Sequence, residues 1–129
     1  MIPGVVKADL HIHTCLSPCG DMDMYPKQIV ETAKERNLSL IAVCDHNTAG
    51  NAHAVIEAAV GTGLLVLPGL EICTREEVHI LGIFPTHEEA MKISNRCLET
   101  VHQMNRPELF GDRFLSWLTE RSPVSKIRP

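Results

Sequence analysis

Apolar positions along this chain switch between a period of two and the period of a helix, which predicts strands alternating with helices. Continuous apolar runs indicate strands that are covered on both faces. Helices are expected where an apolar stripe begins near a proline or a capping residue and ends near asparagine or glycine. The expected strands are 5–13, 40–44, 64–67 turned by Pro68-Gly69 into 70–72, and 78–84, and the expected helices are 26–37, 52–60 and 86–104. This order predicts an α/β fold of βαβ units with about four parallel strands.

The two faces of the first strand are expected to differ, because side chains of a strand alternate between its faces. The face expected to enter apolar packing is formed by Ala8, Leu10 and Ile12. The opposite face carries Asp9, His11 and His13. Burying a carboxylate and two imidazoles without partners is unfavourable, but a metal ion turns that arrangement into a favourable one. The alternative interpretation is a polar strip that faces solvent.

Other residues with metal-binding side chains also follow predicted strands. His46 comes just after the apolar run 40–44, and Glu71 lies at the end of the third strand. Sites in parallel α/β sheets form at the carboxyl ends of the strands. We therefore expect His11, His13, His46 and Glu71 to converge at one edge of the sheet.

The overall composition is that of one soluble domain. The 129 residues suffice for a modest core, and the net charge of −4 argues against a broad electrostatic surface for nucleic acid. No segment approaches the about 20 apolar residues of a membrane span, and five cysteines cannot form a complete disulfide framework, so a cytoplasmic location is expected. The pattern weakens near the C-terminus, which predicts a domain over 1–104 and an irregular tail over 105–129.

Four motifs, in a fixed order, carry a resemblance to a known family. They are Asp9-Leu10-His11-Ile12-His13-Thr14 followed by Asp21, then Cys44-Asp45-His46, Pro68-Gly69-Leu70-Glu71 and Val78-His79-Ile80-Leu81-Gly82. Over about residues 5–85 the chain resembles the PHP (polymerase and histidinol phosphatase) family. The resemblance implies a distorted (β/α)7 TIM-like barrel with up to three metal ions at its C-terminal face. It also implies hydrolysis of phosphoesters by a phosphatase or nuclease, with a phosphorylated small molecule, nucleotide or oligonucleotide as substrate.

The resemblance assigns roles to individual residues around two or three divalent ions of zinc, manganese or iron. His11 and His13 would bind the first metal, Glu71 would bridge the first and second, His79 would bind the second and His46 the third. Glu71 and His79 would be the catalytic positions, and no protein nucleophile is needed because the metals activate water.

The supporting residues are assigned less directly. The remaining early ligand falls on Asp21, with Cys19 as a thiolate alternative. Asp9 and Asp45 adjoin or flank ligand histidines and suit the orientation of imidazoles by accepting an N–H. Arg75 would meet a substrate phosphate, or else is a solvated charge.

The remaining cysteines and histidines have simpler interpretations. Cys15 and Cys19 lack a second cysteine pair, so a structural zinc site is not expected. Apolar contexts suggest small core residues at Cys44, Cys73 and Cys97. His53 and His87 lie on or beside helix starts and are expected to be solvated.

The chain departs from the family pattern in its second half. No histidine follows His102, no Asp-x-His follows position 13, and a (β/α)7 barrel needs about twice this length. The resemblance therefore covers the N-terminal half of a barrel, whose fourth strand exposes an edge. A truncated product, a partner subunit or self-association of two half-barrels would each explain this. The alternative function is a non-catalytic, metal-binding or structural PHP-like protein that associates with a partner.

Overall fold

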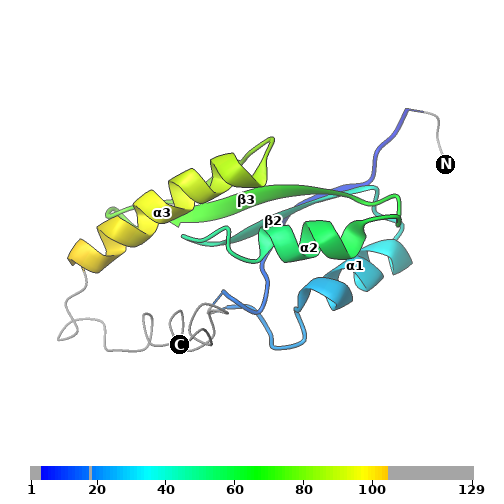
Figure 1. Cartoon of the computed structure of the whole chain (residues 1–129), viewed down its shortest axis with the longest axis horizontal. Coiled ribbons are helices and arrows are strands. Elements are labelled where there is room, and N and C mark those ends of the chain that lie inside the picture. The colour runs from blue at the N-terminus through cyan, green and yellow to red at the C-terminus, as the bar shows by residue number, and fades with distance from the viewer. Residues whose placement is uncertain (1–3, 18, 105–129) are drawn as a thin grey trace, which may run out of the picture.

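The computed structural model describes residues 4–17 and 19–104, in which three helices accompany one four-stranded sheet (Figure 1). The strands are β1 (Ala8–Ile12), β2 (Leu40–His46), β3 (Leu65–Cys73) and β4 (His79–Ile83), and the helices are α1 (Pro26–Glu35), α2 (Ala52–Ala59) and α3 (His87–Met104). The expected tail over 105–129 lies outside the described residues. Within the described part of the chain, no helix has both the length and the apolar character needed to cross a bilayer.

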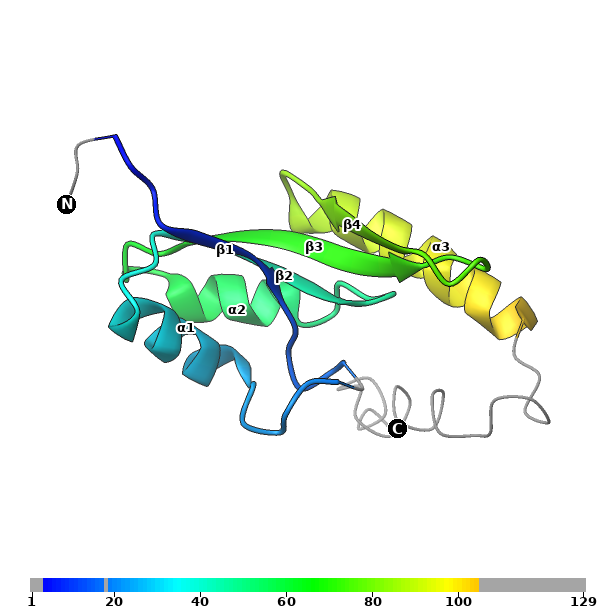
Figure 2. The ribbon, with the colours of Figure 1, turned by 180° about the vertical axis from the view of Figure 1, so that it is seen from behind.

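The sheet has the order β1-β2-β3-β4, and its first three strands are parallel (Figure 2). Leu10 of β1 and Leu81 of β4 line one cavity although their strands lie at opposite edges, so the sheet is curled. The predicted α/β half-barrel is thus confirmed.

The direction of β4 differs from the expectation, because β4 runs antiparallel to β3. Only residues 74–78 separate the two strands, whereas a parallel connection needs a crossover of a dozen or more residues. This reversal has a useful consequence for the site. β4 begins at the edge where β3 ends, so His79 faces Cys73 in the ladder.

Strand β3 is continuous through Pro68 and Gly69, so the expected turn at these residues is wrong. The Pro68 carbonyl accepts a hydrogen bond from the Phe84 backbone N–H at 2.9 Å. A Cβ on Gly69 would lie 2.6 Å from the Gly82 carbonyl oxygen and 2.7 Å from the Cys44 Sγ. Glycine is therefore required here for close packing with both neighbouring strands.

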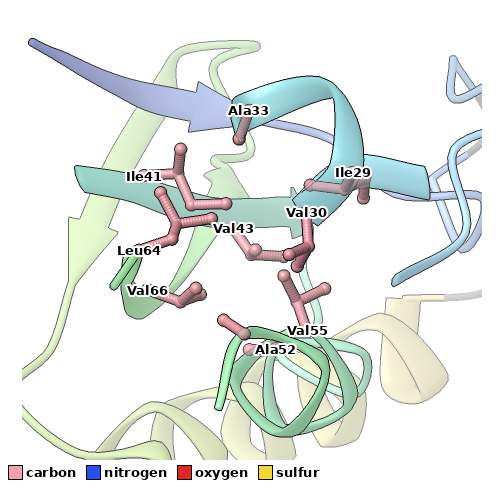
Figure 3. Packing of buried hydrophobic residues seen from close by; sticks show 10 residues of the cluster. Ile29, Val30, Ala33, Ile41, Val43, Ala52, Val55, Leu64 and Val66 are labelled. Atoms are coloured by element: carbon pink, nitrogen blue, oxygen red, sulfur yellow. The ribbon is translucent and has the colours of Figure 1, made fainter. Parts of the chain in front are cut away.

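The hydrophobic core lies between the sheet and the helices α1 and α2 (Figure 3). The two helices contribute the stripes that their sequences predict, and β2 and β3 contribute alternate side chains. The buried members shown are Ile29, Val30 and Ala33 of α1, Ile41 and Val43 of β2, Ala52 and Val55 of α2, and Leu64 and Val66 at β3. This core fixes the helical side of the sheet and leaves its carboxyl edge free for polar side chains.

Helix α3 lies behind β4 in Figure 2 and begins at the predicted capping box. The Thr86 Oγ1 accepts the backbone N–H of Glu89 at 3.3 Å and donates to the Glu89 carboxylate at 3.1 Å. Buried Ser94 accepts the Ala49 backbone N–H through its Oγ at 3.1 Å. This bond ties α3 to the segment between β2 and α2.

The faces of β1 depart from strict alternation. Ile12 packs against the core as expected, but Leu10 is 42% exposed. The register between β1 and β2 shifts between Asp9 and Ile12, so an extra residue interrupts the alternation. The expected burial of Leu10 is wrong for this reason.

The packing at Gly69 leads to a prediction about stability. We expect Gly69→Ala to lower the free energy of unfolding by about 1–3 kcal/mol or more, because the new methyl group must displace backbone and sulfur atoms. Gly50→Ala is the matched control, since its nearest contact is a side-chain oxygen at 3.3 Å. Urea unfolding followed by circular dichroism measures both. Equal stability of the two variants would contradict the close packing described for β2, β3 and β4.

Candidate metal centre

Four histidines gather around one glutamate at the carboxyl edge of the sheet. His11 lies in β1 and His13 directly follows this strand. His46 ends β2 and is the ladder partner of Glu71 in β3, and His79 begins β4. The sheet topology therefore brings together all four imidazoles and the carboxylate, as the sequence motifs suggest.

The two carboxylate oxygens of Glu71 face different histidines. Oε2 lies 3.1 Å from the Nε2 atoms of both His11 and His13, and 3.5 Å from the Nδ1 of His46. Oε1 lies 2.7 Å from the Nδ1 of His79. One carboxylate thus joins two groups of imidazoles, which is the geometry of a bridging ligand.

Glu71 is ionised in this environment even though it is only 6% exposed. Burial by itself opposes its ionisation, but hydrogen bonds from His11 and His79 and the charge of His46 outweigh that effect and lower the pKa of Glu71. Burial also lowers the pKa of His13, reinforced by the nearby His46. The centre thus combines a carboxylate with a neutral imidazole, and both are in the protonation state required of a metal ligand.

A chain of hydrogen bonds leads from buried Asp45 to His13. The Ser17 hydroxyl donates to the Asp45 Oδ1 at 2.7 Å. Its oxygen can then accept the Nδ1–H of His13 at 3.0 Å and accepts the backbone N–H of His46 at 3.1 Å. With the proton on Nδ1, the Nε2 of His13 presents a lone pair to Glu71. Asp45 therefore acts on His13 through Ser17, and not by direct contact with an imidazole.

The same carboxylate organises the loop after β1. Asp45 also accepts the backbone N–H and the hydroxyl of Thr14, each at 2.6 Å. The side-chain amide of Asn51 donates to the Thr14 hydroxyl at 3.0 Å. Sequence reasoning did not single out Thr14, Ser17 or Asn51. The available signal was Asp45 itself, since a buried carboxylate needs donors and the nearby loop contains hydroxyl groups.

The donor atoms fit a divalent metal ion. The Nε2 atoms of His11 and His13 and the Oε2 of Glu71 lie 3.1 Å from one another. A tetrahedral zinc ion, with bonds of about 2.0–2.1 Å, sets its ligand atoms about 3.3 Å apart. The lone pairs of His13 and Glu71 repel each other at this distance unless a cation lies between them. His11, His13 and Glu71 could therefore hold a metal ion after small adjustments.

Of the two candidates for the early ligand, the structure places Cys19 closer to the histidines. Cys19 forms a group with His13 and His46 whose ligand atoms all lie within 4.8 Å of one another. Asp21 is exposed, and its carboxylate accepts the backbone N–H of Asp23 at 3.3 Å. Asp21 belongs to none of the potential metal-binding groups found among the described residues.

Two other residues considered at the site lie at its periphery. The Asp9 carboxylate accepts the backbone N–H of His11 at 3.2 Å, so its hydrogen bond in the structure is to the main chain and not to an imidazole. Arg75 is exposed on the turn between β3 and β4.

The cysteines differ from one another more than their similar apolar contexts suggest. Cys44 is fully buried, and burial, together with the charge of Asp45, raises its pKa to about 12. Cys97 is half-buried. Cys73 is exposed, with its Sγ 3.2 Å from the Nε2 of His79, so the expectation of a core residue is wrong there. Cys73 ends β3, where the apolar run leaves the core.

Comparison with known proteins agrees with this geometry. The chain is 34% identical over 87 residues to the uncharacterised protein MJ1587 of Methanocaldococcus jannaschii, covering 61% of this chain and 50% of that protein. It is 32% identical over 80 residues to a 5′-3′ exoribonuclease of Haemophilus influenzae, covering 60% of this chain and 28% of the relative. The chain thus spans half or less of the length of these relatives.

A solved structure shows the same fold. It is that of a Bifidobacterium adolescentis protein regarded as a metal-dependent phosphoesterase, with a TM-score of 0.58 and 30% identity. The similarity covers 78% of this chain and 35% of the solved chain. The model of the PHP domain family matches residues 9–120, which is most of the chain. This chain belongs to the PHP domain family.

Proposed function

We propose that this chain contributes a metal-dependent centre for phosphoester hydrolysis, of the phosphatase or nuclease type. One observation carries the proposal: a single buried carboxylate contacts four imidazoles that come from three strands and the loop after β1. The family and the phosphoesterase relatives support the same class of reaction. The substrate would be a phosphorylated small molecule, a nucleotide or an oligonucleotide.

In this proposal the centre holds two or three divalent ions of zinc, manganese or iron. His11 and His13 bind the first, Glu71 bridges the first and second, and His79 binds the second. The separate directions of the two Glu71 oxygens support the bridging role. His46 binds the third ion together with Cys19, which the geometry favours over Asp21. When bound, such ions supply Lewis acidity toward a phosphate ester and lower the pKa of water.

The chain's own residues prepare the centre for this chemistry. Ionised Glu71 provides negative charge that attracts cations into a site lined by neutral imidazole. Asp45 and Ser17 hold the His13 ring in one orientation and one tautomer. Asp9 fixes the backbone of His11. Arg75 is near the β3 end of the site in sequence and would bind a phosphate oxygen of the substrate.

We also propose that a partner covers the open side of the half-barrel, either a second copy of this chain or another polypeptide. Among the described residues β4 pairs with β3 alone, and Val78 and Ile80 are 53% and 51% exposed. Sedimentation velocity tests self-association, for which we expect a dimer at micromolar concentration and which a monomer would contradict. All five cysteines are free, which fits a reducing cytoplasmic environment.

Glu71 is the most sensitive position for activity. We expect Glu71→Gln to lower the rate of manganese- or zinc-dependent hydrolysis by at least about 100-fold, because it removes a charge shared by two ions, and even an outer-shell loss costs 10–100-fold. The assay uses a chromogenic phosphomonoester and a short RNA, each with and without a chelator. Glu57→Gln is the matched control, since Glu57 is exposed on α2.

The outcomes of this assay separate the two function classes. Activity that survives both the chelator and Glu71→Gln would contradict the proposed chemistry. Stoichiometric metal binding without turnover on either substrate would favour the alternative, a metal-binding PHP-type protein without catalysis.

Ser17→Ala tests the positioning of His13. Loss of the hydroxyl leaves the His13 Nδ1–H and the Asp45 carboxylate without their common partner, so we expect zinc affinity to fall by about 10–100-fold. Ser39→Ala, at an exposed serine before β2, is the control and should bind zinc as the wild type does. Competition with a fluorescent zinc indicator gives both affinities. Unchanged affinity in Ser17→Ala would show that the hydrogen-bond chain does not orient His13.

A further inference from the structure

The exposed thiol of Cys73 lies beside the centre and has no role in the function proposed above. We propose that Cys73, His79 and His46 form a thiolate metal site that selects a borderline-soft divalent ion, such as zinc or cobalt. This site deepens the proposed function, on which it rests for the use of His46 and His79 as ligands.

The ligand atoms lie close to the arrangement that such an ion needs. The Cys73 Sγ lies 3.2 Å from the His79 Nε2, and all three ligand atoms of the group lie within 4.8 Å of one another. Tetrahedral zinc, with a Zn–S bond of about 2.3 Å and a Zn–N bond of about 2.0–2.1 Å, would separate sulfur and nitrogen by about 3.6 Å. The Cys73–His79 pair is therefore within about half an ångström of coordination distance. Both side chains are partly in solvent and can rotate to accommodate an ion.

The two ring nitrogens of His79 point toward different partners. Its Nδ1 lies 2.7 Å from the Glu71 Oε1, and its Nε2 faces the Cys73 sulfur. A metal-binding histidine commonly donates its other ring N–H to a carboxylate, which fixes the tautomer and the ring orientation. Glu71 serves as that carboxylate when it accepts the Nδ1–H of His79. The Nε2 then carries a lone pair toward the space that it shares with Cys73.

The backbone holds these ligands on rigid elements. Cys73 and His79 are ladder partners where β3 and β4 meet. Asn47, which follows His46 with a φ of 55°, accepts the Cys73 backbone N–H through its Oδ1 at 3.0 Å. The Asn47 backbone N–H donates to the Glu71 carbonyl at 2.8 Å. Asn47 therefore links the ends of β2 and β3 and keeps Cys73 beside the histidines.

The chemistry of the ligands decides which metals this site would prefer. A thiolate is a soft ligand that favours zinc-like ions, whereas carboxylate and water suit magnesium and manganese. Binding converts the Cys73 thiol to a thiolate and releases its proton to solvent. The site should thus bias the centre toward zinc or cobalt even if manganese supports hydrolysis.

Cobalt(II) titration of the reduced full chain tests the proposal, because a thiolate ligand gives cobalt a charge-transfer absorption in the near ultraviolet. We expect this band in the wild type and in Cys15→Ser, the control at a nearby cysteine outside the groups. Cys73→Ser should lose about half of the band or more, since at most one other thiolate, that of Cys19, lies near these histidines. Cys73→His should bind as much cobalt as the wild type while showing the reduced band. Circular dichroism of each variant verifies that it is folded.

Three results are informative about the cause. A band that is unchanged in Cys73→Ser, or one that disappears entirely in Cys19→Ser, would overturn the proposal. A Cys73-dependent band without any metal-dependent hydrolysis would support the thiolate site and contradict the proposed function. Hydrolysis that requires Glu71, without a Cys73-dependent band, would support the function and overturn the thiolate site.

Discussion

The ionised carboxylate of Glu71 is the group on which the rest of the site depends. It is 6% exposed, and its two oxygens lie within 3.5 Å of four imidazole nitrogens. In a buried place a carboxylate persists only when hydrogen bonds or positive charges compensate for lost hydration. Here the histidines supply the compensation, and two of their nitrogens also approach each other at 3.1 Å. Such a concentration of donor atoms is best satisfied by cations.

The scaffold is arranged to deliver these groups to one edge. Parallel β1, β2 and β3 bring His11, His46 and Glu71 there, and the short antiparallel return adds His79. The missing side chain at Gly69 allows the strands on either side to approach closely. Core packing is confined to the helical side, so the polar edge is not required for the stability of α1 and α2. The fold therefore separates the residues that stabilise it from those that carry chemistry.

Much of this could be predicted from the sequence, because apolar runs mark strands and strand ends mark the site. The alternation of strands and helices gave the fold class, and the positions of His11, His46 and Glu71 after apolar runs gave their convergence. The direction of β4 could have been inferred from the short link over residues 74–78, which forbids a crossover. The exposure of Leu10 could not, since it follows from a register shift that only the paired strand reveals.

The supporting residues were harder to predict for a different reason. Ser17 contacts His13 and Asp45 because of how the loop after β1 folds, and loop conformation has no periodic signal. Cys73 resembles a core cysteine in sequence, yet β3 extends beyond the core at that point. The choice between Asp21 and Cys19 likewise depends on loop geometry. Local pattern thus identifies the primary ligands, and tertiary structure identifies the residues that orient them.

The central claim is that Glu71, His11 and His13 together hold a metal ion. Anomalous X-ray diffraction from crystals soaked in zinc tests it most directly. The account predicts an anomalous peak about 2.0–2.2 Å from the Nε2 atoms of His11 and His13 and from an oxygen of Glu71. Zinc bound only elsewhere on the chain, with these three side chains uncoordinated, would contradict it.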